Sequence, residues 1–361
     1  MKITFIKPIV TQNGGSRVVA IYAEKLLAMG HDVTVVSRFP ERKSFSRRTL
    51  DFLKGSAAQP SDPNRTVYYD GLGDRHIQVP WTESLNANDV PDADVVIATW
   101  WRTAFEVAAF PPEKGAKAYF VQGHEVYGTL PRDLSRGSYF LPLAKITIAQ
   151  WLVDVMSKNY DDQDVTLVPN SVDTRLFFAA ERNKHKVPTI GLIYSDQALK
   201  NTALGLRAVD EVRKKFPDLK LVAFGTCNPT QELPLPRYAT YHKLPAQSDL
   251  PRIYASCDAW VMSSDSEGYG LPILEAMACR TPVVSTRTGA GPDLITDGAE
   301  GFVVDIGDQT ALADRLAKII GLDNAAWRKM SEAAHSKAHG YSWDDAATKF
   351  EAALQQIVMA K

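Results

Sequence analysis

Two glutamates, Glu267 and Glu275, stand on either side of a glycine-rich turn in the stretch SDSEGYGLPILEAMA, residues 264–278. The preceding run, DAWVMSS, is typical of a strand, and Pro272 suits the first turn of a helix, where its missing N–H costs nothing. Helix amino termini attract phosphate groups, and carboxylates accept hydrogen bonds from hydroxyl groups. The stretch therefore predicts a helix start that binds phosphates and sugars together.

The backbone amides of this turn are the expected ligands of a diphosphate. Those around Tyr269, Gly270 and Leu271 follow the carboxyl end of the predicted strand. Glu275 lies early in the helix, where the helix dipole favours a carboxylate whether or not it binds a ligand. A helix start and a binding site are thus compatible.

A second glycine turn, Gly14-Gly15 in VTQNGGSRVV, follows the first predicted strand. Glycines there let a ligand approach the amides of the next helix, for which Ser16 is the expected cap. The spacing differs from the Gly-x-Gly-x-x-Gly fingerprint of dinucleotide-binding dehydrogenases and argues against that class. The alternative is a tight turn that simply requires glycine.

Two further groups follow strands of the first half. His124 and Glu125, in VQGHEVYG, are expected to face the ligand side of a sheet. No second histidine follows at zinc-ligand spacing, so a zinc site is disfavoured, and packing of His124 within a loop is the alternative. Trp100 and Trp101 are either core residues or an aromatic platform for an acceptor sugar.

Composition bounds the class of protein. The chain has 361 residues, 45% of them hydrophobic, and a formal net charge of −1, which favours two globular domains and gives no sign of nucleic-acid binding. Three cysteines without metal-ligand spacing suggest buried thiols in a reducing cytoplasm. The start MKITFIKPIV predicts a strand rather than a signal peptide, and no run has the length of a membrane span.

Strand-like and helix-like runs alternate, which predicts an α/β protein with parallel sheets. KITFIKP, a helix ending before Gly30, and DVTVVSR form the first βαβ unit, and a second series begins at PTIGLIYS. The irregular segment NSVDTRLFFAAERNKHKV, with the break near 172–187, is the expected linker. We predict two Rossmann-like doubly wound domains, 1–172 and 173–340, with ligands in the cleft between them. A last helix, 341–361, with Ser342 as its cap, is expected to pack towards the first domain.

The block from Ser263 to Asp305 resembles the nucleotide-sugar motif of retaining glycosyltransferases with the GT-B fold, of the large family-four type. Supporting matches are GGSRVVAIYAEKLLAMGHDVTVVS, LVPNSVDTRLF and YSWDDAATKF, so the resemblance spans nearly the whole chain. TWWRTAFEV and YFVQGHEVYG resemble the subset that acts in bacterial polysaccharide biosynthesis, including rhamnan-type enzymes.

The resemblance implies a role for each matching residue. Glu267 would contact hydroxyls of the donor sugar and Glu275 the ribose, with His124 near the sugar and Lys200 on the diphosphate. The implied catalytic residues are thus Glu267, Lys200 and His124. The donor-binding residues are then Gly14, Gly15, Gly268, Tyr269, Gly270, Leu271, Glu275, Tyr194 and Ser195. Apart from the resemblance, Glu125, Trp100 and Trp101 are the predicted acceptor-binding residues.

One position departs from the family pattern. The family usually pairs that lysine with an arginine on the strand that opens the second domain, whereas this chain has GLIYSDQALKN, with Tyr194 or Ser195 at the arginine position. One positive charge of the diphosphate clamp is therefore missing or comes from elsewhere, with Arg17 and Arg287 as candidates.

Three other patterns have simpler explanations. Asp92 and Asp94 form an Asp-x-Asp pair that binds a metal in GT-A enzymes, but they precede their strand and are expected to be turn residues. His335 and His339 are expected on a solvated helix face. The basic segment Glu41–Gly55 is a surface helix or loop, or a contact with anionic lipid for an enzyme that uses a lipid-linked acceptor.

The resemblance implies a reaction and its partners. A sugar would move from a nucleotide diphosphate to a hydroxyl of a glycan or lipid-linked glycan with retention, without a metal or other cofactor, in a cytoplasmic enzyme that sometimes touches the membrane. Helix amides and Lys200 would stabilise the departing diphosphate. The alternatives are a sugar-nucleotide epimerase on the same fold and a non-catalytic scaffold, which the missing arginine favours.

Overall fold

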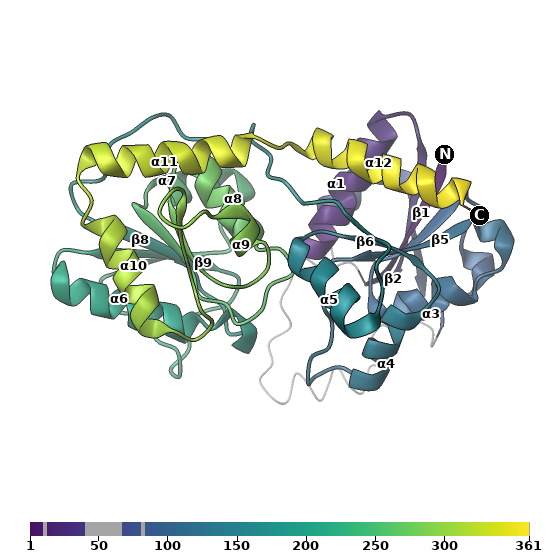
Figure 1. Ribbon diagram of the computed structural model, residues 1–361, viewed down its shortest axis with the longest axis horizontal. Coiled ribbons are helices and arrows are strands. Elements are labelled where there is room, and N and C mark those ends of the chain that lie inside the picture. The colour runs from purple at the N-terminus through teal and green to yellow at the C-terminus, as the bar shows by residue number, and fades with distance from the viewer. Residues whose placement is uncertain (10–12, 40–66, 81–83, 361) are drawn as a thin grey trace, which may run out of the picture. The chain divides into compact units, whose positions relative to one another are not determined.

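The computed structural model describes residues 1–9, 13–39, 67–80 and 84–360, which divide into two compact units (Figure 1). Unit 1 comprises Met1–Ile148, Leu152–Val168 and Ala347–Lys361, and unit 2 comprises Ala149–Trp151 and Pro169–Ala346. The basic segment Glu41–Gly55, a predicted lipid contact, lies outside the described residues. Among the described helices, none combines the length and the apolar composition needed to span a membrane.

Unit 1 is built on a seven-stranded parallel sheet in the order β3-β2-β1-β4-β5-β6-β7. The strand order reverses between β1 and β4, so this is the topological switch point of the sheet. Its strands are β1 (Lys2–Ile9), β2 (Asp32–Phe39), β3 (His76–Pro80), β4 (Val95–Ala98), β5 (Ala116–Val121), β6 (Ala144–Thr147) and β7 (Val165–Leu167). Its helices are α1 (Gly14–Ala28), α3 (Trp101–Ala109), α4 (Arg132–Gly137), α5 (Gln150–Tyr160) and most of α12 (Trp343–Met359).

Unit 2 repeats the plan with a six-stranded parallel sheet in the order β10-β9-β8-β11-β12-β13, whose switch point lies between β8 and β11. Its strands are β8 (Thr189–Ile193), β9 (Lys220–Gly225), β10 (Ala239–Lys243), β11 (Ala259–Met262), β12 (Val283–Thr286) and β13 (Gly301–Val304). Its helices are α6 (Thr202–Lys215), α7 (Leu250–Ala255), α8 (Leu271–Ala278), α9 (Gly291–Leu294), α10 (Gln309–Ile320) and α11 (Asn324–His339). Helices α6 and α10 pack together, and α8 packs against α7 and α11 (Figure 1).

The last part of α12 completes the core of unit 1. Phe350 stacks on Tyr22 of α1 at 4.4 Å and contacts Phe5 of β1 and Phe120 of β5. His31 Nε2 lies 2.7 Å from a carboxylate oxygen of Glu351. Aromatic contacts of this kind dominate the energetics of a core, so residues 347–360 are an integral part of the first unit.

Trp260 of β11 is fully buried in unit 2. Its ring contacts Tyr254 at 4.5 Å and lies over Gly191 of β8, where an added Cβ would come within 2.2 Å of the indole. Glycine is therefore required at that strand position because the neighbouring strand carries the largest side chain.

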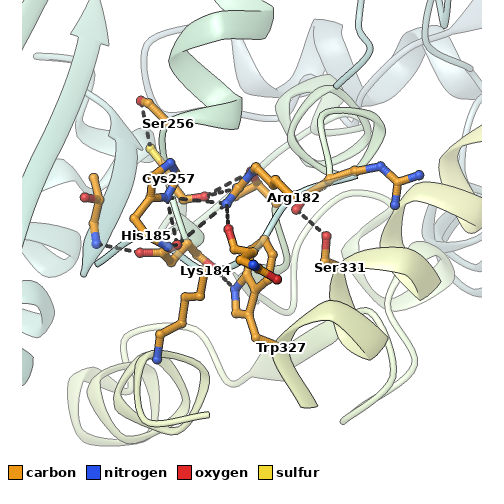
Figure 2. Close-up of polar contacts among 12 residues, drawn as sticks. Arg182, Lys184, His185, Ser256, Cys257, Trp327 and Ser331 are labelled. Carbon is orange, nitrogen blue, oxygen red and sulfur yellow. Dashed lines mark hydrogen bonds and ion pairs between the residues drawn. The ribbon is translucent and has the colours of Figure 1, made fainter. Parts of the chain in front are cut away.

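The segment predicted as a linker is fixed onto unit 2 over residues 182–185 (Figure 2). Arg182 donates to the carbonyl of Cys257 at 2.5 Å and lies over the ring of Trp327, and His185 Nδ1 lies 2.9 Å from the buried carboxylate of Asp258. Lys184 donates to the carbonyls of Ile320 and Leu322, at the carboxyl end of α10. These contacts lie near the amino ends of β8 and β11, away from the carboxyl edge where ligands bind.

Two of the predicted helix ends agree with the structure, and one predicted cap does not. The expected cap Ser342 is confirmed, since its Oγ accepts from the Asp345 amide at 3.1 Å, and Gly30, with φ +89°, does follow the end of α1. Ser16 is wrong as a cap, because α1 begins two residues earlier and Asn13 Oδ1 accepts from the Ser16 amide at 2.8 Å. Asn13 directly precedes the two glycines and caps the helix there, so Ser16 already lies inside the first turn.

Candidate functional site

Loops from two neighbouring strands meet at the switch point of unit 2. β8 and β11 pair directly, and the chain leaves the carboxyl ends of both, as Tyr194–Asn201 and as Ser263–Gly270. Open parallel sheets bind their ligands at this place because the loops diverge there and leave a crevice. The second loop contains Glu267 and the glycine turn that leads to Glu275.

Two predicted catalytic residues, Lys200 and Glu267, are in direct contact here. Lys200 Nζ lies 2.8 Å from each carboxylate oxygen of Glu267, and Ser264 Oγ donates to one of those oxygens at 2.6 Å. The Glu267 side chain is only 9% exposed, whereas that of Lys200 is 36% exposed. Lys200 is thus accessible to a ligand while it neutralises a largely buried carboxylate.

Residues that the sequence patterns did not single out hold the two loops together. Asn201 Nδ2 donates to Asp265 at 2.9 Å, the Asp265 amide donates to the carbonyl of Leu199 at 2.8 Å, and Ser263 Oγ donates to the carbonyl of Asn201. Asn201 adopts the left-handed conformation and caps α6. An Asn that directly precedes a helical run was the available sequence signal.

The turn between the glutamates is held by two side-chain hydrogen bonds. Gly270, with φ +88°, precedes α8, and Pro272 occupies the first helical turn as predicted. Trp151 Nε1 donates to the carbonyl of Gly268 at 2.9 Å, and Tyr269 Oη donates to the carbonyl of Asn170 at 2.7 Å. The Ile273 amide is already bonded to the Gly270 carbonyl at 2.9 Å and Pro272 has no N–H, so the predicted phosphate ligands are the amides of Tyr269, Gly270 and Leu271 that precede Pro272.

The loop that follows β12 supports this turn by close contact. Gly289 has φ +55°, and an added Cβ would lie 2.5 Å from the carbonyl oxygen of Tyr269 and 2.9 Å from Cβ of Glu267. The Ala290 amide donates to the same carbonyl of Tyr269 at 2.8 Å. The position of Glu267 therefore depends on a residue without a side chain.

Glu275 lies on α8, apart from the Lys200–Glu267 pair. It is 5% exposed, and Tyr254 Oη on α7 donates to its Oε2 at 2.8 Å. A buried carboxylate held by a hydroxyl donor has a fixed orientation. Its predicted contact with a ribose stays a prediction.

The two residues at the position of the missing arginine are occupied by internal contacts. Tyr194 is 1% exposed, its Oη donates to the carbonyl of Leu233, and the backbone of Ser195 exchanges hydrogen bonds with the Thr202 hydroxyl. Arg287, a suggested replacement, follows β12 and lies 3.1 Å from Asp305 with 59% of its side chain exposed. Arg17 lies on α1 in unit 1.

The switch point of unit 1 carries the other predicted residues. Gly14 and Gly15 begin α1, and an added Cβ on Gly15 would lie 3.5 Å from Oε1 of Gln122, which follows β5. His124 Nε2 lies 2.7 Å from Tyr160 Oη, and its ring packs on that of Tyr139. Burial and the nearby Arg136 lower the pKa of His124, so its imidazole is neutral at pH 7.

Glu125 interacts electrostatically with a lysine that the sequence patterns did not single out, Lys7 of β1. Glu125 Oε2 accepts from the Trp101 amide at 2.8 Å. Burial raises the pKa of Glu125 to about 8, against the opposing effects of the Trp101 amide and Lys7, and burial lowers the pKa of Lys7 to about 8. A lysine within the apolar strand KITFIKP was the signal that could have found this pair.

The two tryptophans differ in exposure. Trp101 is 8% exposed and begins α3, whereas Trp100 is only partly buried, and their ring centroids lie 5.1 Å apart. The sequence left open whether these residues are core residues or a platform for a sugar, and Trp101 is a core residue. Only Trp100 keeps ring surface for an acceptor sugar, and that role stays a prediction.

The remaining sequence candidates lie away from the carboxyl edges. Asp92 pairs with Lys114 and Asp94 accepts from the Lys2 amide, both before β4. His335 Nδ1 lies 2.9 Å from the carbonyl of Ala278, so its predicted solvated position is wrong and only His339 is exposed. Cys257 and Cys279 are buried as predicted, but Cys227 is partly exposed.

A cavity of about 730 Å³ lies at the opposite edge of the unit 1 sheet. Its lining includes the amino ends of β5, β6 and β7, through Ala116, Ala144 and Val165, and Ile357 of α12. None of the predicted site residues lines it. Ligands of doubly wound sheets bind at the carboxyl edge, so this cavity is not the candidate site.

Comparison with known proteins finds a family similarity over the second unit. Residues 173–337 match the model of the glycosyl transferases of group 1. The chain is 29% identical over 219 residues to the D-inositol 3-phosphate glycosyltransferase of Corynebacterium jeikeium, in a match that spans 54% of this chain and 52% of that relative. It is 35% identical over 102 residues to the O-antigen chain mannosyltransferase B of Escherichia coli, spanning 28% and 26% of the two chains.

The fold has a counterpart among solved structures. Anabaena HepE, in complex with UDP and glucose, superposes with a TM-score of 0.71 over 99% of this chain and 100% of that chain at 15% identity. The two-domain α/β fold predicted from the sequence is thereby confirmed. The match over residues 173–337 bears out the predicted resemblance to GT-B glycosyltransferases. The chain spans about half the length of the inositol-phosphate relative it matches.

Proposed function

We propose that this protein, which has the GT-B fold and the group 1 glycosyl transferase region, transfers a sugar from a nucleotide diphosphate to a hydroxyl group of a glycan or lipid-linked glycan with retention of anomeric configuration. The observation that carries the proposal is the contact of Lys200 with Glu267 at the switch point of unit 2, beside the glycine turn that begins α8. This single place offers a cation and helix amides for a diphosphate and a carboxylate for sugar hydroxyls.

The two partners of the ion pair exchange their contacts when the donor binds. The diphosphate attracts Lys200 away from Glu267, since a phosphate group carries more negative charge than one carboxylate. Glu267 is then available to accept hydrogen bonds from hydroxyls of the donor sugar. The ligand-free protein thus keeps both groups paired and oriented until the donor replaces each partner.

The transfer step requires no protein base. The acceptor oxygen bonds to the anomeric carbon while the bond from that carbon to the diphosphate oxygen breaks, and the acceptor proton passes to that departing oxygen. Lys200 and the first amides of α8 stabilise the negative charge that develops on the leaving group. No metal or other cofactor takes part in this proposal.

Glu267 and Glu275 do not suit the two-carboxylate mechanism of glycoside hydrolysis. That mechanism needs an acid and a base or nucleophile on either side of one bond. Here Glu267 is paired with Lys200, and Glu275 is buried on α8 with a hydrogen bond from Tyr254. Their separate environments support one sugar-binding and one ribose-binding role instead.

Two similarities support the donor and the biological setting. Anabaena HepE was solved with UDP and glucose, which supports a nucleotide diphosphate sugar as donor. The Escherichia coli relative is named for an O-antigen chain, which supports a role in bacterial surface polysaccharide biosynthesis. We propose a cytoplasmic enzyme that meets a lipid-linked acceptor at the membrane face, with residues 41–55 as its contact.

The proposal is tested in two steps. A thermal-shift panel of nucleoside diphosphates identifies the base, since a ligand that binds the folded state raises the melting temperature with its concentration. The matching nucleotide sugars are then incubated with and without glycan acceptors. Product that forms only with an acceptor supports a transferase, altered nucleotide sugar without an acceptor supports an epimerase, and the absence of any nucleotide shift supports a non-catalytic scaffold.

A further inference from the structure

Lys7 and Glu125 lie at the carboxyl edge of the unit 1 sheet, at its switch point. Ile6 of β1 pairs with Ala98, the last residue of β4, so Lys7 lies one residue beyond the carboxyl end of that neighbouring strand. Lys7 is 6% exposed and interacts electrostatically with Glu125. A lysine this deeply buried is costly unless a carboxylate compensates its charge.

Glu125 is engaged by groups from four separate elements. Its Oε2 accepts from the Trp101 amide at the start of α3, at 2.8 Å, with Tyr119 Oη of β5 farther away at 3.5 Å. Its own amide donates to Tyr139 Oη at 2.8 Å, and its carbonyl accepts from Ser135 Oγ of α4. Its backbone amide, its carbonyl and one carboxylate oxygen are thus all engaged within unit 1.

The same contacts determine where the neighbouring site residues lie. Tyr139 Oη also donates to the carbonyl of Gly123, so the amide and the carbonyl on either side of His124 are both held by one hydroxyl. Trp101 and the partly exposed Trp100 are held through the α3 amide that Glu125 accepts. The predicted acceptor residues and His124 thus share one support.

We infer that Glu125 is a positioning residue that sets the amino end of α3, with Trp100, relative to the His124 loop. This assignment rests on the proposed function and replaces the direct acceptor contact that the sequence predicted for Glu125. Its carboxylate acts through Trp101 and does not touch substrate.

Two substitutions separate positioning from contact. The variant Glu125→Gln keeps a side-chain oxygen that accepts from the Trp101 amide, whereas Glu125→Ala removes it. We expect Glu125→Ala to increase hydrogen exchange in the peptide that contains Trp101 and to lower kcat/KM for the acceptor, since misplacement of about 1 Å costs on the order of 100-fold. Glu125→Gln is expected to restore both at pH 7.

The pH profile supplies a readout that a purely structural role would not move. Groups facing the pair are Tyr119 of β5, Tyr139, and, around His124, Tyr160 of α5 and Arg136 of α4. As the pH rises through about 8, the pair passes from a positive to a negative net charge. The rate of transfer by the wild type should therefore change near pH 8. The rate of transfer by Glu125→Gln should show no such change near pH 8.

Lys7→Met tests the effect of the lysine charge on Glu125, with Lys145→Met as the matched control. Lys145 is 5% exposed in the same sheet but lies in β6 beside Asp162, near the amino edge. We expect Lys7→Met to shift the change in transfer rate from about pH 8 to higher pH, since Glu125 loses the cation that favours its charged form. Lys145→Met should leave the profile where it is.

The outcomes distinguish this inference from the proposed function. If Glu125→Gln is as inactive as Glu125→Ala while the Trp101 amide stays protected, the carboxylate contacts substrate and the inference is overturned. It is also overturned if neither variant alters exchange at Trp101. If the wild type shows no thermal shift with any nucleoside diphosphate, the proposed function fails, but the exchange data still decide whether Glu125 positions α3.

Discussion

Lys200 Nζ lies 2.8 Å from both carboxylate oxygens of Glu267, although the two residues come from different loops and are 67 positions apart in the chain. The pair forms because β8 and β11 are neighbours in the sheet and both loops leave its carboxyl edge. A cation and a carboxylate that neutralise each other are a stable resting state for a site that takes an anion and hydroxyl groups together.

Removal of either partner should abolish most of the transfer activity. We expect Lys200→Met to lower kcat by about 100-fold or more, because a lost electrostatic contact to developing charge has an effect of that size. The double variant with Glu267→Gln should bind a nucleoside diphosphate better than Lys200→Met alone, since it leaves no unpaired carboxylate beside the phosphates. Steady-state kinetics and calorimetric titration with the nucleotide measure both effects.

The control for this prediction is an ion pair on the same unit. Lys215 lies 3.4 Å from Asp314, with 63% and 65% of the two side chains exposed. Exposed pairs contribute little, so Lys215→Met should leave transfer and nucleotide affinity unchanged. Equal losses in Lys200→Met and Lys215→Met would show that the site assignment is wrong.

Stability should pass through a minimum near pH 8 because of Lys7 and Glu125. The pKa of Glu125 is raised on folding from 4.5 to about 8, so the stability it contributes below pH 4.5 is lost as the pH rises to about 8. The pKa of Lys7 is lowered from 10.5 to about 8, so the stability it contributes above pH 10.5 is lost as the pH falls to about 8.

Urea unfolding of the wild type and Glu125→Gln at pH 5.5, 8 and 10 measures this minimum. The glutamine does not titrate, so the decrease between pH 5.5 and 8 should be smaller in the variant than in the wild type. An identical pH dependence in the two proteins would mean that folding does not raise the pKa of Glu125.

A side chain at position 289 should displace the donor turn. In Gly289→Ala the new Cβ would lie 2.5 Å from the carbonyl oxygen of Tyr269, so the turn that holds Glu267 must move. The matched control is Gly307→Ala, where φ is +78° and no atom lies within 4 Å of an added Cβ. Both variants bear the strain of the left-handed conformation, about 1–2 kcal/mol, but only Gly289→Ala should weaken nucleotide binding in a thermal-shift titration.

That Glu267 and Lys200 lie near each other could be predicted from the sequence, because parallel strands bring the loops at their carboxyl ends to one edge of the sheet. The sequence could not predict the side-chain direction of Tyr194, which turns to the Leu233 carbonyl and is buried. Lys7 was missed for a related reason, since a strand pattern shows that a lysine is surrounded by apolar residues but not which carboxylate lies opposite. Pairings between distant segments depend on tertiary packing that periodicity does not encode.

Removal of the Tyr254 hydroxyl should weaken the protein more than removal of the Tyr269 hydroxyl. Both rings are buried and both substitutions to phenylalanine delete one hydroxyl, but Tyr254 donates to the Glu275 carboxylate at 2.8 Å and Tyr269 to the backbone carbonyl of Asn170 at 2.7 Å. Hydrogen bonds to charged groups contribute about 1.5–3 kcal/mol and those between neutral groups about 0.5–1.5 kcal/mol.

Chemical denaturation and nucleotide titration of the two variants provide the comparison. Tyr254→Phe should lose more unfolding free energy than Tyr269→Phe, and it should also weaken nucleotide binding if Glu275 holds the ribose, because the carboxylate loses a donor that orients it. Tyr269→Phe loosens the turn at Asn170 but leaves Glu275 and its Tyr254 contact in place. A larger loss of nucleotide affinity in Tyr269→Phe than in Tyr254→Phe would transfer the ribose-binding role from Glu275 to the turn.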